Sequence, residues 1–182
     1  MGVLLNAIRA KGMDQTRMPC HLGLRAVLDS WSREEAVAKL EKHGVASSCH
    51  MLIADPTGGV GVEWSYVDVR KIPMGTHGQV HHTNHFLLDH PGVVDTVWLE
   101  DSKDRIKRIG ELVGSLGDSP DIESVQGLFK DESNYPSAIC RASKDENGSA
   151  TLFNIVMDLE AKKAKVILGR PTEPEEFLDL AL

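Results

Sequence analysis

The chain has 182 residues, of which 41% are hydrophobic and 26% charged, and its net charge is −7. This length is enough to bury a hydrophobic core, and we expect residues 1–182 to form a single domain. The acidic balance argues against nucleic acid and anionic membrane surfaces as partners, because both bind basic surfaces. No apolar stretch approaches the length that crosses a bilayer, and no basic region precedes the short apolar run at the N-terminus. The sequence therefore predicts neither a membrane span nor a secretion signal.

The first half of the chain predicts strands and helices in turn. Residues 1–6 have the pattern of a strand that is already under way, and residues 18–30 have a helical pattern behind Pro19. Ser32 and Glu35 form a capping box at the start of a second helix, which Gly44 is placed to end. The hydrophobic period then changes from about 3.6 to 2. The strands expected from this change are residues 49–55, 60–67, 69–72 and 79–86, with a turn at residues 56–59 joining the first two as a hairpin.

The second half repeats this order. Residues 102–116 and 119–130 predict helices, the second with Pro120 at its first helical position. Strands are expected at residues 138–143 and 150–158 around the Asn147-Gly148 turn, followed by a strand at residues 165–169 and a helix at residues 173–180. Helices alternating with antiparallel strands predict an α+β fold in which helices stack on sheets. The sequence has no Gly-x-Gly-x-x-Gly motif, so it does not predict a dinucleotide-binding fold.

The cysteine pattern predicts free thiols. Cys20, Cys49 and Cys140 are far apart and odd in number, which is typical of a reducing compartment, and we expect a cytoplasmic location. A nucleophilic cysteine needs a base and an electropositive setting. Arg141 follows Cys140 but would point to the opposite face of a strand. We therefore expect Cys140, and likewise the other two, to be small buried hydrophobic residues.

Two strand segments place polar residues among apolar ones. Alternation puts Glu63 and Ser65 on one face of their strand, opposite Val62 and Trp64, which is the pattern of a half-exposed strand or of a site.

Asn84 falls on an otherwise apolar face of the strand expected at residues 79–86. An asparagine there costs free energy unless its amide finds partners, so it either braces a loop or awaits a substrate oxygen. An amide aimed at a developing oxyanion is a known catalytic device.

The histidines of the same segment raise the alternative of a metal hydrolase. His81 and His85 would lie about 13 Å apart along a strand, and His82 and His85 would point to opposite faces. We therefore expect no metal site, and the metal content of the purified protein decides this alternative.

Six segments, in this order and spacing, resemble the isopenicillin-N (acyl-coenzyme A:aminopenicillanic acid) acyltransferase family of cysteine N-terminal-nucleophile enzymes. The similarity covers nearly the whole chain. The segments are Pro19-Cys20-His21-Leu22, Gly61-Val62-Glu63-Trp64-Ser65, His82-Thr83-Asn84-His85, Asn134-Tyr135-Pro136 with Ile139-Cys140-Arg141-Ala142, Ala150-Thr151-Leu152-Phe153-Asn154-Ile155, and Leu168-Gly169-Arg170-Pro171-Thr172.

The resemblance implies a four-layer αββα fold and chemistry on an amide or thioester bond. In that family the precursor cleaves itself before a cysteine, whose sulfur then attacks the substrate with its own α-amine as base. By this resemblance Asn84 stabilises the oxyanion and Ser65 serves maturation or the pocket. The residues expected to bind substrate, a small-molecule amide or acyl-coenzyme A, are Glu63, His82, Thr83 and Arg141. No cofactor is expected.

The sequence departs from the family at two points. An arginine found just before the Ala150-Thr151-Leu152-Phe153 segment in some members is replaced by Gly148. The family's cysteine lies upstream of the point where this chain begins, and none of the three cysteines here has its sequence context. We therefore expect the C-terminal part of such an enzyme, nearly inactive alone and a partner for a missing N-terminal segment. The alternative is a non-catalytic ligand-binding remnant of the same domain.

Overall fold

The computed structural model of the chain describes residues 1–143 and 148–182. The chain divides into two compact units, Met1–Ser102 and Lys103–Leu182. The described residues contain both helices and antiparallel sheets, in agreement with the expected α+β class. The expected single domain stays a prediction. Among the described residues, no helix combines the length and the apolar character that a membrane crossing requires.

The first unit is built on a four-stranded antiparallel sheet in the order β1-β3-β4-β5. All four strands were expected from the sequence, with small differences at their ends. A second, two-stranded ladder joins β2 to β6. The bounds are β1 (Gly2–Ala7), β2 (Ala10–Lys11), β3 (Cys49–Asp55), β4 (Gly58–Trp64), β5 (Val69–Pro73) and β6 (Val94–Asp95).

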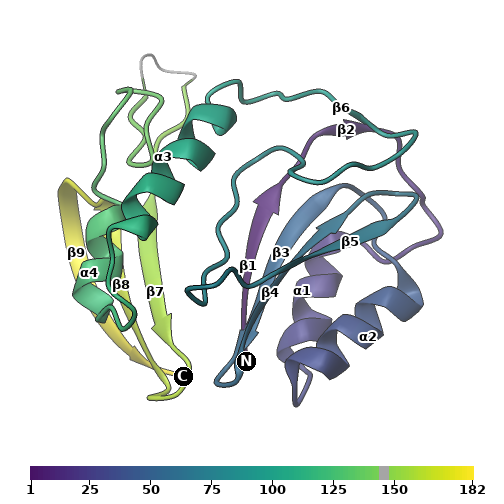
Figure 1. The fold of residues 1–182 in the computed structure, drawn as a ribbon, viewed down its shortest axis with the longest axis horizontal. Coiled ribbons are helices and arrows are strands. Elements are labelled where there is room, and N and C mark those ends of the chain that lie inside the picture. Colours follow the sequence, from purple (N-terminus) through teal and green to yellow (C-terminus); the bar gives the residue numbers. More distant parts are fainter. Residues whose placement is uncertain (144–147) are drawn as a thin grey trace. The chain divides into compact units, whose positions relative to one another are not determined.

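Two helices, α1 (Cys20–Leu28) and α2 (Arg33–His43), cover one face of this sheet (Figure 1). The predicted cap of α2 is confirmed, because the Ser32 side chain accepts a hydrogen bond of 3.2 Å from the backbone amide of Glu35. Gly44 ends the helix with φ at 66°, a conformation that strongly favours glycine. The start and the end of α2 are therefore where the sequence predicted them.

The hydrophobic core of the first unit fills the space between these helices and the sheet. Alternate residues of β3 and β4 point into it, as the pleat of a strand requires. The residues between them, including His50 and Glu63, therefore face the other side of the sheet. The buried residues of the core are Val27, Ala36, Val37, Leu40, Val45, Cys49, Met51, Ile53, Val62 and Trp64.

The strand expected at residues 79–86 is absent, and that prediction is wrong. Residues 74–93 contain no strand, and we call them the covering segment because they lie over the sheet face that carries Glu63. Their backbone amides bind side chains in place of a neighbouring strand: the Asn84 amide donates to Ser102 Oγ and the Phe86 amide to Asp95 Oδ2. Asn84 therefore projects from a loop, and the facing pattern inferred from a strand does not apply.

The second unit contains most of α3 (Ser102–Gly114), α4 (Ile122–Leu128) and a three-stranded antiparallel sheet. The sheet has the order β7 (Phe153–Asp158), β8 (Lys163–Arg170) and β9 (Glu173–Ala181). Both helices were expected. Asp121 caps α4 by accepting from the Ser124 amide, so Pro120 precedes the helix and is not its first residue.

Two further expectations in this unit are wrong. Residues 173–180 form the edge strand β9, because pairing with β8 satisfies the backbone, whereas an isolated helix of two turns is marginal in water. Residues 138–143 form no strand, because their amides bind turn partners, as when Cys140 N donates to the Asp131 carbonyl. The expected turn at Asn147-Gly148 falls partly outside the described residues.

The core of the first unit gives a direct test of its packing. Leu40 is fully buried, and Leu40→Ala should lower the free energy of unfolding by about 2–5 kcal/mol because a cavity remains. Leu22 lies on α1 with 60% of its surface exposed, and Leu22→Ala should change stability by no more than about 0.5 kcal/mol. Urea denaturation measures both, and equal losses would contradict this assignment of the core.

Candidate functional site

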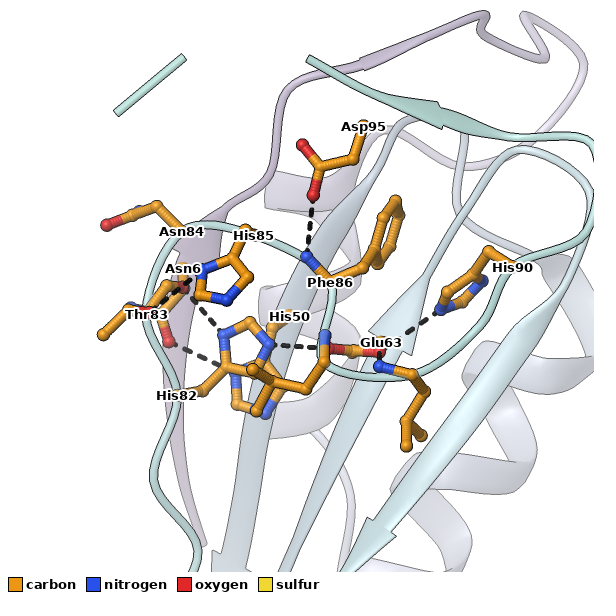
Figure 2. A network of polar contacts seen from close by, with 12 residues as sticks. Asn6, His50, Glu63, His82, Thr83, Asn84, His85, Phe86, His90 and Asp95 are labelled. Atoms are coloured by element: carbon orange, nitrogen blue, oxygen red, sulfur yellow. Dashed lines mark hydrogen bonds and ion pairs between the residues drawn. The ribbon is translucent and has the colours of Figure 1, made fainter. Parts of the chain in front are cut away.

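A row of polar side chains crosses three strands of the first sheet, on the face opposite the helices. Asn6 pairs with His50 across β1 and β3, and His50 pairs with Glu63 across β3 and β4. His50 and Glu63 are almost wholly buried. Buried polar groups need hydrogen-bond partners, and the covering segment supplies most of them (Figure 2).

The carboxylate of Glu63 is the centre of this network. Its Oε1 accepts from His82 Nε2 at 2.8 Å and from the Leu87 amide at 2.6 Å. Its Oε2 accepts from the Leu88 amide at 3.0 Å and from His90 Nε2 at 3.3 Å. Burial raises the pKa of Glu63, but the hydrogen bonds from His82 and the two amides outweigh it and hold the pKa below its usual value. Glu63 is therefore a buried carboxylate that binds the covering segment at four points.

His82 has a hydrogen-bond acceptor at each of its ring nitrogens. Nδ1 lies 2.7 Å from the Thr83 carbonyl, and Nε2 lies 2.8 Å from Glu63. Both ring nitrogens therefore face oxygen acceptors, which fixes the orientation of the ring. The ring also stacks on His50, with centroids 3.8 Å apart and an angle of 7° between planes.

His50 is held neutral beneath the His82 ring. Burial and then the positive charge of His82 lower the pKa of His50 to about 3, while Glu63 opposes the shift. Its Nδ1 lies 3.2 Å from Asn6 Oδ1, and its Nε2 has no hydrogen-bond partner among the described residues. A side chain at Gly61 would come within 2.7 Å of this nitrogen, so the ring requires glycine beside it.

Ser65 is connected to Glu63 through Asp68 and His90. The Ser65 hydroxyl donates to Asp68 Oδ1 at 2.6 Å and accepts from the Asp68 amide at 3.0 Å. Asp68 Oδ1 in turn lies 2.5 Å from His90 Nδ1, so His90 bridges Asp68 and Glu63. Burial raises the pKa of Asp68. The hydrogen bonds from Ser65 and His90 lower it by more, so the pKa lies below its usual value.

The loop that carries Asn84 is tied to Ser102 and to the end of β1. Thr83 Oγ1 donates to the Ser102 carbonyl, and the backbone amide of Asn84 donates to Ser102 Oγ at 2.7 Å. The half-buried side chain of Asn84 donates from Nδ2 to the Ala7 carbonyl at 3.0 Å. These contacts fix both the backbone and the side-chain amide of Asn84.

The structure thus brings five of the six predicted site residues into the first unit. Glu63, His82 and Ser65 belong to one hydrogen-bonded network, and Thr83 and Asn84 follow His82 on the covering segment. Arg141 belongs to the second unit, where its backbone amide donates to Thr151 Oγ1. Within residues 1–143 and 148–182, no group of three or more His, Cys, Asp and Glu residues is placed to hold a metal ion.

A family model described as acyl-coenzyme A:6-aminopenicillanic acid acyl-transferase matches residues 1–173. The chain belongs to this acyltransferase family. It is 37% identical over 179 residues to the acyl-coenzyme A:6-aminopenicillanic-acid-acyltransferase 40 kDa form of Emericella nidulans. That match covers 97% of this chain and 50% of the relative, so the chain spans about half the length of that protein.

Sequence reasoning about this acyltransferase-family chain missed several members of the network. Asn6, His50, Asp68 and Ser102 carry contacts that no motif predicted. His50 had a usable signal, since it is a polar residue inside an otherwise apolar strand. The burial expected for the cysteines holds for Cys49 and Cys140 and is wrong for Cys20, which is partly exposed.

The Glu63 network predicts a large cost for a nearly isosteric change. In Glu63→Gln, one carboxylate oxygen becomes an NH2 group that faces two N–H donors, while the histidines lose their counter-charge. We expect a loss of about 3–5 kcal/mol in the free energy of unfolding. Glu41→Gln, at an exposed pair with Lys71, should cost no more than about 1 kcal/mol. Denaturant melts that rank the two variants equally would contradict the central role of Glu63.

The lowered pKa of His50 predicts a pH dependence of stability. The unfolded chain takes up a proton near pH 6.5, whereas folded His50 stays neutral until about pH 3, so acid favours the unfolded state between these values. Each pH unit below 6.5 should cost about 1.4 kcal/mol from this residue.

Stability curves between pH 5 and 6.5, a window taken from this pKa shift, measure the effect. His50→Gln should flatten the slope, whereas His43→Gln on the exposed side of α2 should leave it unchanged. A His50→Gln slope equal to that of the unmodified protein would show that His50 is not the titrating group.

Proposed function

We propose that this chain supplies the oxyanion-stabilising part of an acyltransferase or amide hydrolase that acts on an amide or thioester bond. Asn84 donates its amide to the substrate's carbonyl oxygen as negative charge develops there. The attacking sulfur is an N-terminal cysteine on polypeptide outside this chain, so the chain alone has little or no activity. Family membership supports acyl transfer as the reaction class.

The fixed position of Asn84 is the observation that carries this proposal. A donor stabilises a transition state well only when it is held in place before the reaction. The backbone of Asn84 is bound to Ser102 and its side chain to Ala7. A side-chain amide has two donor hydrogens, so a bond to Ala7 is compatible with donation to a substrate.

The buried charges provide the support for this loop. Glu63 on β4 and His82 within the covering segment are both enclosed, with side-chain exposures of 0% and 1%. In place of the substrate contact expected from the sequence, we propose that they and Thr83 hold the loop, because enclosed groups orient a neighbour instead of meeting solvent. Ser65 keeps its proposed role in the pocket or in maturation, and Arg141 its proposed contact with substrate.

We also propose the further features that the resemblance to the family implies. These are the αββα layering, the self-cleaving N-terminal-nucleophile chemistry, a single domain over residues 1–182, and a cytoplasmic location. The relative's name specifies acyl-coenzyme A as its donor and 6-aminopenicillanic acid as its acceptor. For this chain we propose an acyl-coenzyme A or a small amide as substrate.

Reconstitution tests the function. The chain is co-expressed with the half of the Emericella nidulans relative that it does not match, and acyl transfer from phenylacetyl-coenzyme A to 6-aminopenicillanic acid is followed. We expect turnover only when both parts are present. Asn84→Ala should then lower kcat by about a hundred- to a thousandfold with a small change in KM, as for other oxyanion donors.

Two controls make this experiment decisive. Ser115→Ala, at an exposed residue after α3, should leave kcat unchanged, and thermal melting should show that Asn84→Ala remains folded. Undiminished kcat in folded Asn84→Ala would remove the proposed role of Asn84. A thermal shift with phenylacetyl-coenzyme A but no turnover in the reconstituted protein would contradict an enzyme and support a ligand-binding domain.

A further inference from the structure

A pocket of about 480 Å³ lies where the C-terminal end of β1 meets the start of α1. Its volume falls within the usual range for sites that bind small molecules. All of its lining residues belong to the first unit, and Glu63, His82 and His90 are not among them. Much of the lining is apolar and comes from Leu5, Ala7, Ile8, Met13 and Trp98.

A reactive thiol lines this apolar pocket. Cys20 is the first residue of α1, and its Sγ lies 3.4 Å from His21 Nδ1. A hydrogen bond from the Cys49 thiol lowers the pKa of Cys20 to about 5; the charge of His21 and the Ser47 hydroxyl add to this, while burial opposes it. The same pairing and burial raise the pKa of Cys49, which stays a neutral donor. Thiolate character and partial exposure are the two properties of reactive cysteines.

The pocket also contains an unused hydrogen-bond donor. Ser48 lines it, is 8% exposed, and its hydroxyl has no hydrogen-bond partner among the described residues. A buried hydroxyl without a partner costs free energy, so its retention calls for an explanation. A carbonyl oxygen bound in the pocket would satisfy it.

We propose that this pocket binds the acyl group of a thioester and that Cys20 accepts that group. The apolar lining receives the acyl chain, the Ser48 hydroxyl donates to the carbonyl oxygen, and the sulfur of Cys20 is the nucleophile. The choice of a thioester rests on the proposed acyl-coenzyme A chemistry, whereas the pocket and the thiol do not depend on it.

The step is a balanced exchange between two sulfur atoms. The Cys20 thiolate attacks the carbonyl carbon of the thioester, and the oxygen takes up negative charge opposite Ser48. When the intermediate collapses, the carbon–sulfur bond to coenzyme A breaks and a bond to Cys20 remains. The products are an S-acyl cysteine and the coenzyme A thiolate, which takes a proton from solvent, so no oxidant or further reactant is needed.

Mass spectrometry of the 182-residue chain alone tests this inference, and its result is therefore independent of the reconstitution experiment. Incubation with hexanoyl-coenzyme A should add one hexanoyl group, which peptide mapping places on Cys20. The rate should saturate with hexanoyl-coenzyme A concentration. Cys20→Ser should abolish the adduct, and Cys140→Ser, at a buried cysteine of the second unit, should retain it.

Iodoacetamide separates binding in the pocket from general thiol reactivity. Ser48→Ala should slow hexanoylation at least about tenfold, because a carbonyl donor is lost, but should leave alkylation of Cys20 and the melting temperature unchanged. Removing a hydroxyl that has no partner carries little structural cost. Alkylation of Cys20 without hexanoylation would overturn the proposal. So would a hexanoylation rate that never saturates, or acylation that Ser48→Ala leaves unchanged.

Discussion

The burial of one negative charge is the constraint on which the first unit depends. Glu63 is 0% exposed, and a carboxylate in that position is tolerated only when charged or polar donors surround it. The chain provides two histidines and two backbone amides, all from the covering segment. Residues 74–93 have no strand ladder of their own, so the attraction of these donors to Glu63 takes the place of regular backbone pairing.

This arrangement explains how a loop can hold Asn84 in a defined position. Two residues before Asn84, the ring of His82 is fixed by Glu63 below and by the stack on His50. The next residue, Thr83, and Asn84 itself are bound to Ser102. Loops positioned by a rigid scaffold commonly carry functional groups. The carboxylate of Glu63 on β4 therefore helps to position the side-chain amide of Asn84 on the loop.

Much of the fold followed from hydrophobic periodicity, whereas the network depended on register. The expected turn over residues 56–59 would place His50 opposite Ser65. The structure turns at Pro56-Thr57 instead, with Asp55 opposite Gly58, and this sets His50 opposite Glu63. Because a shift of register changes every cross-strand pair, the polar row could not be predicted without the turn geometry. The same limit applies at β9, where pairing with β8 decided between strand and helix.

Gly61 illustrates how an empty position shapes its surroundings. Its missing side chain leaves the space that the His50 ring occupies, with Nε2 against the bare backbone of β4. The His50 ring, and the His82 ring stacked on it, can therefore take these positions only because Gly61 has no side chain. Any larger residue there would push against the imidazole and against Val80 of the covering segment, and through His82 would displace the loop that carries Asn84.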